Sequence, residues 1–286
     1  MLRYPQETGR LVVMSVKACC PRLLLVFLLL TLLSLSLAHA SAKGGLCEPY
    51  KTLVFEGGGV RGVIYPGALI ALHEAGLLQT VQNFAGTSAG SGTAALLALG
   101  FSACELREEV EEYSFHELVD FSLPKALRNA FFGIEAGKLF SKLAAKKGFF
   151  SGDKLERKFD MIIQRKLCSK ALGLSTVREL PANSIHLAED GDCGQYKQAT
   201  FASALDGNIE LKLTGFDITH GRLRWFSRET TPNMPISKAI RISSGIPFIF
   251  EPVEYDGALY LDGGVLRNLP VSINAIPAQH FQPTNF

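Results

Sequence analysis

Ser88 is the residue whose setting points most directly to chemistry. It lies at the centre of Gly86-Thr87-Ser88-Ala89-Gly90, after a segment, 81–85, that can end as a short strand, and before an apolar segment, 91–99, that suits a buried helix. A serine on a sharp strand-to-helix turn exposes its hydroxyl at the carboxyl edge of a sheet. The helix N-terminus behind it favours the negative charge of a developing oxyanion. The pattern predicts a nucleophile elbow made of Gly86, Thr87, Ser88, Ala89 and Gly90, although ordinary turns can carry the same residues.

A glycine-rich segment follows another expected strand, 51–56. The backbone N–H groups of Gly58 and Gly59 can point at the oxygen that becomes negative during acyl transfer. Arg61 is expected to hold this loop, to attract an anionic head group, or to form a structural salt bridge. The segment therefore predicts an oxyanion hole built from Gly57, Gly58, Gly59, Val60, Arg61 and Gly62.

The same glycines also match a dinucleotide-binding fingerprint, because Gly57, Gly59 and Gly62 have its spacing. That fingerprint needs an acidic residue about 20 positions further on, at the end of the second strand. Residues 75–90 contain no Asp or Glu, and the serine turn stands in that place. The sequence therefore disfavours a nucleotide ligand.

Asp262 is the candidate general base for Ser88. A serine hydroxyl is a weak nucleophile until a base accepts its proton. Asp262 ends an expected strand or hairpin near 260–264, and Gly263 and Gly264 let the backbone bend close to the serine turn. Taken alone, Asp-Gly-Gly is also typical of a simple turn. If the strands before these motifs are parallel, their carboxyl ends meet at one crevice, where the three motifs would converge.

A Ser-Asp-His triad is the alternative arrangement, because Ser88, Asp262 and His280 stand in that order. His280 lies in a polar tail with no strand before it, and Glu56 precedes the glycines where hydrolases with such triads often carry histidine. A dyad of Ser88 and Asp262 is the simpler prediction.

The secondary-structure elements that must position these residues alternate between expected strands and expected helices. The expected strands 51–56 and 81–85 are followed by expected helices 68–76 and 91–99. Further strands are expected at 209–217 and 223–226, and a helix at 235–244. Alternating strands and helices predict an α/β fold with a mostly parallel sheet.

The overall composition limits the kinds of partner that the chain is expected to bind. The 286 residues carry a net charge of +2, so no strong field favours nucleic acid. Four cysteines beyond residue 40 could form two disulfides in three pairings or stay as isolated thiols, and no Cys-x-x-Cys pair suggests a metal site. These cysteines are Cys47, Cys104, Cys168 and Cys193. A basic stretch at 125–170 carries several phenylalanines and could contact lipid, although solvated helix faces over a normal core are the preferred explanation.

The N-terminal residues have the pattern of a secretory leader. A basic start, an apolar run at 23–37 and a small-x-small site ending at Ala40 predict a secretory signal peptide over residues 1–40. An uncleaved anchor through 23–37 is the alternative, and it would hold the chain at a membrane. Residues 41–50 are expected to be a linker.

Together, the three motifs, their order and Ile246-Pro247-Phe248 ahead of the aspartate resemble the patatin-like phospholipase family. The resemblance implies a domain over 51–276 with a three-layer α/β fold. It also implies a Ser88-Asp262 dyad, an oxyanion hole at 57–62 and no metal or organic cofactor. The short tail 277–286 departs from the family, whose members usually continue through further helices, which is consistent with a truncated C-terminus.

The resemblance implies a lipid acyl hydrolase. The expected substrates are glycerolipids or phospholipids, met at a membrane or lipid-droplet surface, and the expected intermediate is an acyl-enzyme. The alternative is a catalytically silent lipid-binding or scaffold protein on the same fold, but the intact motifs disfavour it.

Overall fold

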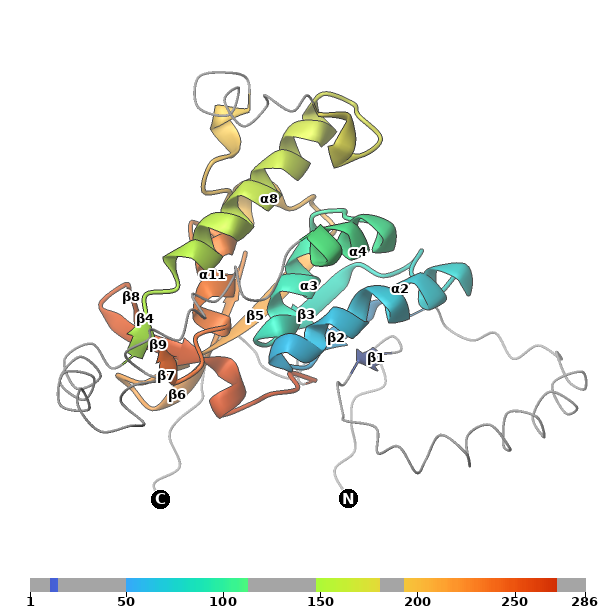
Figure 1. Cartoon of the computed structure of the whole chain (residues 1–286). Helices are drawn as coiled ribbons and strands as arrows, with labels where there is room; N and C mark the ends of the chain where they lie inside the picture. The colour runs from blue at the N-terminus through green and yellow to red at the C-terminus, as the bar shows by residue number, and fades with distance from the viewer. Residues whose placement is uncertain (1–10, 15–49, 113–147, 181–192, 272–286) are drawn as a thin grey trace, which may run out of the picture.

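A computed structural model describes residues 11–14, 50–112, 148–180 and 193–271 (Figure 1). Its strands are β1 (Leu11–Met14), β2 (Thr52–Phe55), β3 (Asn83–Gly86), β4 (Gly148–Phe150), β5 (Glu210–Asp217), β6 (Arg222–Ser227), β7 (Phe248–Phe250), β8 (Val253–Tyr255) and β9 (Ala258–Asp262). Its helices are α2 (Tyr65–Glu74), α3 (Ala89–Ala98), α4 (Ala103–Glu112), α8 (Asp153–Ala171), α10 (Phe201–Ala204) and α11 (Ile236–Ser243). Short 3-10 turns are η1 (Gly59–Ile64), η2 (Val177–Glu179), η3 (Gly194–Tyr196) and η4 (Gly263–Val265).

The central sheet is mixed. Its main path runs β1-β2-β3-β5-β9-β8, and β6 pairs with β5 off this path. The pairs β1–β2, β2–β3 and β3–β5 are parallel, whereas β9 runs antiparallel to both β5 and β8. In the part of the sheet that the structure describes, five strands thus share one direction, and β6 and β9 oppose it. The fold is α/β with a mostly parallel sheet flanked by helices, as predicted.

Strand β5 has three partners, and this arrangement brings the site together. Residues 212–217 pair with β6, so β6 occupies one edge of β5. On the other edge, β3 pairs with 210–213 and β9 pairs with 215–217. Since β3 and β9 run in opposite directions, their carboxyl ends face each other across Thr214. The expectation that the aspartate follows a parallel strand is therefore wrong, because β9 is antiparallel and arrives from the other end of β5.

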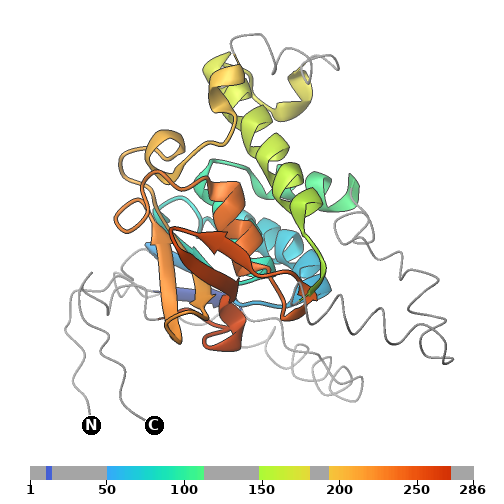
Figure 2. The ribbon, with the colours of Figure 1, turned by 90° about the vertical axis from the view of Figure 1, so that its left-hand side faces the viewer.

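Alternation along β2 explains where the core lies. Leu53 and Phe55 are buried in the main hydrophobic core, whereas Val54 belongs to a small cluster with Ala85, against which Leu269 packs. Successive strand residues point to opposite faces, so a strand apolar on both faces must be covered on both. Helices α3 and α11 pack on the core side, and α8 packs on α11 (Figures 1 and 2).

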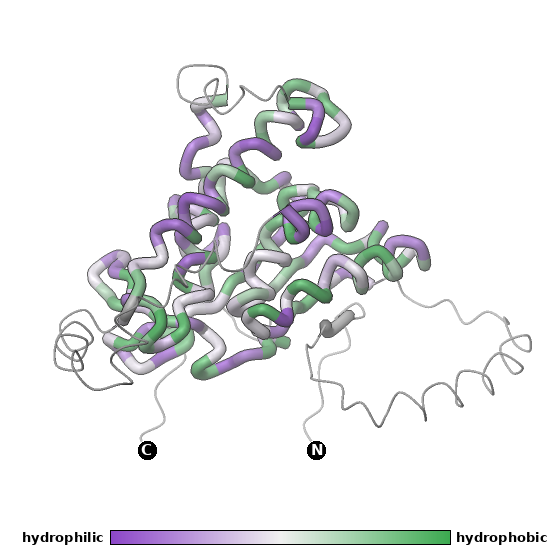
Figure 3. Tube along the Cα trace, viewed as in Figure 1, coloured by the Kyte–Doolittle hydropathy of each residue, from purple (hydrophilic) through white to green (hydrophobic). Residues whose placement is uncertain are grey.

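Helix α8 carries both hydrophilic and hydrophobic residues along its length (Figure 3). It holds the last part of the basic stretch, and its mixed character fits exposed helix faces over a normal core. Phe149 and Phe150 lie in β4, which pairs with β7. Phe131, Phe132 and Phe140 lie outside the described residues.

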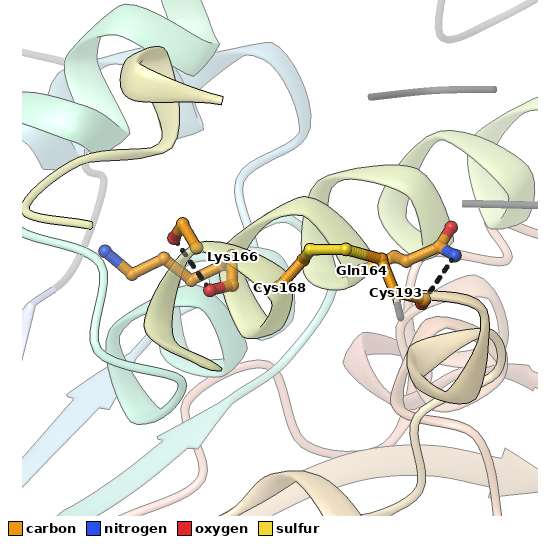
Figure 4. Close-up of a disulfide and its surroundings, with 5 residues drawn as sticks. Gln164, Lys166, Cys168 and Cys193 are labelled. Atoms are coloured by element: carbon orange, nitrogen blue, oxygen red, sulfur yellow. Dashed lines mark hydrogen bonds between the residues drawn. A yellow bond between two sulfur atoms is a disulfide. The ribbon is translucent and has the colours of Figure 1, made fainter. Parts of the chain in front are cut away.

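One disulfide joins Cys168 on α8 to Cys193, with 5.3 Å between their Cα atoms. Figure 4 shows the Gln164 side chain beside it, donating a hydrogen bond to the Cys193 carbonyl at 3.2 Å. Cys104 is exposed and free. The structure thus shows one of the two disulfides that the four cysteines could form, and Cys47 lies outside the described residues.

Most of the expected leader, 1–40, and of the linker, 41–50, lies outside the described residues, as do His280 and the tail 277–286. Strand β1 falls within the leader and extends the sheet beside β2, so cleavage after Ala40 would leave β2 at the edge. In the parts of the chain that the structure describes, no helix combines the length and apolarity needed to cross a bilayer.

Candidate active site

Ser88 lies on a strained turn between β3 and α3. Its backbone has φ 54° and ψ −128°, a region that bulky residues seldom occupy and that recurs at functional turns. Gly86 and Gly90 have no room for a side chain, because a Cβ on Gly86 would meet the Gly90 backbone and a Cβ on Gly90 would meet Phe55 and Glu56 carbonyls. The sequence therefore dictates the predicted elbow.

Two hydrogen bonds hold this turn in place. The Ser88 N–H donates to Ser243 Oγ on α11 at 3.0 Å, and Ser91 Oγ donates to the Ser88 carbonyl at 2.6 Å. Beside the turn, the hydroxyls of Thr87 and Thr214 lie 2.6 Å apart. Ser243 and Thr214 were not predicted as site residues, because only the fold brings α11 and the middle of β5 to the elbow.

Asp262 reaches the serine from the end of β9. Its carboxylate accepts a hydrogen bond from the Gly264 N–H at 2.7 Å and lies close enough to the Ser88 side chain for that hydroxyl to influence its pKa. Its own N–H donates to the Gly245 carbonyl at 2.9 Å. Burial raises the pKa of Asp262 to about 6, although the Gly264 N–H and the Ser88 side chain act in the opposite direction. Asp262 is thus a buried carboxylate placed to accept the Ser88 proton.

Gly263 and Gly264 serve close packing. A Cβ on Gly263 would collide with the Thr214 side chain. A Cβ on Gly264 would lie 2.9 Å from Asn268 Oδ1 and 3.0 Å from Asp262 Oδ1. The two glycines after the aspartate therefore let η4 turn sharply against β5.

The glycine loop lies against the serine. A Cβ on Gly57 would lie 2.9 Å from the Ser88 Cβ, and one on Gly62 would lie 3.0 Å from the Ala89 Cβ. Gly59 has φ +54°, which favours glycine, and it begins η1. Within the described residues, the N–H groups of Gly58 and Gly59 have no backbone acceptor, as expected at the start of a helical turn. These two amides are available to a negatively charged oxygen.

Asn268 fixes the glycine loop, although sequence reasoning gave it no role. The backbone carbonyl of Asn268 accepts a hydrogen bond from the Gly57 N–H at 3.1 Å. Its side-chain Nδ2 donates to the Gly57 carbonyl at 3.0 Å and to Glu56 Oε1 at 3.1 Å. These bonds tie the segment after Asp262 to the segment before η1. Arg61 is exposed and its Nε donates to the Gly58 carbonyl at 3.4 Å, so it holds the loop, one of the roles expected for it.

An apolar pocket of about 210 Å³ opens beside Ser88. Helices α3, α4 and α8 supply much of its wall, through Leu96, Leu106, Leu155, Phe159 and Ile162 among others. Glu109 and Lys158 also line it, and burial raises the pKa of Glu109 and lowers that of Lys158 to about 8. Apolar walls that lead to a nucleophile suit a hydrocarbon chain.

The position of His220 and the question of a metal site bear on the alternative mechanisms. His220 Nδ1 lies 2.9 Å from Asp217 Oδ2, so this ring is paired at the far end of β5 and not with Ser88. No cluster of His, Cys, Asp or Glu in the described residues has an arrangement that could hold a metal ion.

Comparisons with known proteins identify relatives of this chain in sequence and in fold. The chain is 29% identical over 224 residues to the uncharacterized protein R571 of Acanthamoeba polyphaga mimivirus, covering 78% of this chain and 61% of that protein. It is 28% identical over 225 residues to the probable lipid hydrolase 463L of Invertebrate iridescent virus 6, covering 78% of this chain and 63% of that protein. The chain thus spans less than two thirds of the length of these relatives.

Among solved structures, VipD from Legionella pneumophila shares the fold, with a TM-score of 0.50 and 22% identity over 78% of this chain and 47% of VipD. The family model for patatin-like phospholipases matches residues 53–275, which include the glycine loop, the serine elbow and the aspartate turn. This chain therefore belongs to the patatin-like phospholipase family.

Proposed function

We propose that this chain is a lipid acyl hydrolase that cleaves carboxylic esters of glycerolipids or phospholipids through Ser88 and Asp262. The observation that carries the proposal is the close approach of the Ser88 side chain to the buried Asp262 carboxylate. An apolar pocket lies beside them, and so do two glycine N–H groups that have no backbone acceptor within the described residues. Family membership and the similarity to a probable lipid hydrolase support the same class of reaction.

In the first half of the proposed reaction, Ser88 Oγ attacks the ester carbonyl carbon while its proton passes to the Asp262 carboxylate. The carbonyl oxygen becomes negative and accepts hydrogen bonds from the N–H groups of Gly58 and Gly59. The tetrahedral species then collapses, the bond to the alcohol oxygen breaks, and the departing alcohol takes the proton from Asp262. The acyl group remains bonded to Ser88.

In the second half, a water molecule attacks the acyl carbon and gives a proton to Asp262. Collapse releases the fatty acid, and Ser88 Oγ regains the proton. A carboxylate is a weak base in water, and burial of Asp262 strengthens it toward the pKa that neutral pH requires. The apolar pocket would hold the acyl chain during both halves.

The test is labelling and turnover by matched variants. Ser88→Ala and Asp262→Asn should each abolish hydrolysis of a soluble short-chain ester, and Ser88→Ala should abolish labelling by a fluorophosphonate probe. The controls are Ser175→Ala and Asp256→Asn, because both residues are exposed and lie outside the site. Full activity of Ser88→Ala would refute the proposal. Absence of labelling in folded wild-type protein would favour the silent lipid-binding alternative.

The pocket can be tested separately. Thr93 and Leu96 line the pocket one and two turns beyond the serine along α3. Leu96→Trp should fill it and lower kcat/KM for a long-chain ester by about tenfold or more while sparing an acetate ester, because a blocked cleft excludes only the longer chain. Equal losses on both esters would show that the acyl chain binds elsewhere.

We propose further that the chain enters the secretory pathway through the leader 1–40, or stays anchored through 23–37. The disulfide between Cys168 and Cys193 supports an oxidising compartment. Sequencing the N-terminus of the protein purified from its native cells would distinguish the two routes. An N-terminus at Met1 would exclude cleavage.

A further inference from the structure

The exposed apolar side chains of the described chain gather around the candidate active site. Among the described residues, nine large hydrophobic residues are exposed, and seven of them belong to three segments that border the site. These seven are Val60, Val63 and Ile64 on η1, Phe248 on β7, and Val265, Leu266 and Val271 after Asp262. We call the three on η1 together with Val265 and Leu266 the apolar rim. Met161 and Leu172 lie apart from it, on and just after α8.

Hydrogen bonds keep the two halves of the rim together. η1 begins two residues after Gly57, and Leu266 lies two residues before Asn268. The Gly57 N–H donates to the Asn268 carbonyl at 3.1 Å, and Asn268 Nδ2 donates back to the Gly57 carbonyl at 3.0 Å. The rim is therefore a fixed surface beside Ser88, although its members are about 200 residues apart in the chain.

The rim is continuous with the pocket. Val60 and Val63 are 51% and 58% exposed, yet both also line the pocket that contains Ser88. Val60 and Val63 therefore connect the outer surface to the pocket that holds the nucleophile through apolar side chains. An exposed apolar surface has a cost in water, and such patches usually mark an interaction site.

Phe248 is an exposed aromatic residue that lies in the sequence between two residues of the pocket wall. It is 68% exposed and has φ +68°, a strained value for a bulky residue. Its neighbours two positions away, Ile246 and Phe250, line the pocket. A strained backbone that presents an aromatic ring to solvent beside a catalytic pocket is consistent with a ring that inserts into an interface.

We propose that the apolar rim is the surface by which this chain docks on a phospholipid bilayer. This inference rests on the proposed function, because a lipid ester is held within a bilayer and must leave it to reach Ser88. The rim would enter the boundary between head groups and acyl chains, with the exposed Arg61 beside it among the phosphates. The pocket mouth would then open directly onto the hydrocarbon.

The test uses the double variant Ile64→Glu/Leu266→Glu, since neither residue lines the pocket. Leu172→Glu is the control, because Leu172 is 54% exposed outside the rim. Binding is measured by flotation of the full chain with phosphatidylcholine vesicles containing a tenth of phosphatidylserine, in a Ser88→Ala background that prevents turnover. The double variant should bind at least about tenfold more weakly, as expected when charges replace buried apolar side chains, and the control should bind as the parent does.

Hydrolysis separates the docking proposal from the proposed function. With Ser88 present, the double variant should lose hydrolysis of vesicle lipid in proportion to binding but keep kcat/KM on a soluble short-chain ester within about twofold. Unchanged vesicle binding overturns the docking surface and leaves the hydrolase proposal standing. A lowered melting temperature or an altered oligomeric state with unchanged vesicle binding would assign the rim to a segment of this chain or a second copy, and would also overturn it.

Discussion

Ser88 and Asp262 meet because the strands that carry them end head to head on one edge of β5. β3 ends at Gly86 opposite Leu213, and β9 ends at Asp262 opposite Gly215. The single residue between these positions, Thr214, contacts Thr87 through its hydroxyl. The serine and its carboxylate are therefore positioned by the register of one strand, and a shift of either pairing would separate them.

The first prediction concerns the pH dependence of turnover. Asp262 must be unprotonated to accept the Ser88 proton, and its pKa is raised to about 6 by burial. Activity should therefore rise as pH increases through about 6 and level off above it. The measurement is kcat/KM on a soluble ester, which reports groups of the free enzyme. An acidic limb near pH 4, where an ordinary aspartate titrates, would contradict a buried base.

The second prediction is that Asp262 lowers stability at neutral pH. Its pKa is about 6 in the folded chain against 3.8 for an ordinary aspartate, so the folded state binds more protons between these values. The stability of the wild type should fall as pH rises through this window. Asp262→Asn removes this cost and should be more stable by about 2–3 kcal/mol at pH 8, with no gain at pH 3.5.

Urea unfolding at the two pH values measures this difference. Asp256→Asn is the matched control, because Asp256 is exposed in the Asp-Gly turn between β8 and β9 and should show no pH-dependent gain. A gain for Asp262→Asn that is equal at both pH values would show that its source is not the ionisation of Asp262.

The third prediction tests the glycine loop. Gly57→Ala would place a Cβ against Asn268 Oδ1 and the Ser88 Cβ, so the loop must move away from the serine. Displacing the loop amides should lower kcat by about 10²–10³, the effect of losing one oxyanion donor. Gly67→Ala is the control. Gly67 is exposed on α2 with open space around it, and alanine there should stabilise the helix by about 0.5–1 kcal/mol without altering kcat.

The sequence predicted the local turns well, because their residue types are forced by close packing. Gly86, Gly90 and Gly263 each have backbone or side-chain atoms where a Cβ would lie, so these positions exclude other residues. Strands β2, β3, β5 and β6 and helix α11 were expected within a few residues of their bounds. Each is a buried apolar run or an alternating pattern that local periodicity describes.

The direction of β9 could not be obtained from such patterns. An isolated strand ending in Asp-Gly-Gly fits either direction, and only its pairing with β5 decides between them. One local signal was present, because Asp256-Gly257 joins β8 to β9 with both residues at positive φ, which is typical of a tight hairpin. The roles of Asn268 and Ser243 also depend on contacts across more than 150 positions, which no local pattern contains.

The last prediction concerns the buried ion pair that joins α4 to α8. Lys166 Nζ lies 2.8 Å from both oxygens of Glu105, and Glu105 also accepts from the Ser102 N–H at 2.8 Å. Burial raises the pKa of Glu105, but the hydrogen bonds and the Lys166 charge outweigh it and the net pKa is lowered. Lys166→Met would leave a buried carboxylate without its cation and should cost about 3–5 kcal/mol at pH 8.

The pH dependence of the stability loss distinguishes an unpaired buried carboxylate from lost packing as its cause. In the wild type, Glu105 contributes to the free energy of unfolding at pH values above its ordinary pKa. This contribution is lost as pH falls through the lowered pKa of Glu105 in the folded state. In Lys166→Met, the carboxyl can take up a proton at mildly acidic pH, so the deficit relative to wild type should shrink toward pH 4. Glu105→Gln/Lys166→Met should recover much of the loss, because no buried charge remains. Arg178→Met is the control, because it breaks the exposed pair with Glu108 and should cost less than about 1 kcal/mol. An equal loss of stability in Lys166→Met and Arg178→Met would contradict the importance of burial.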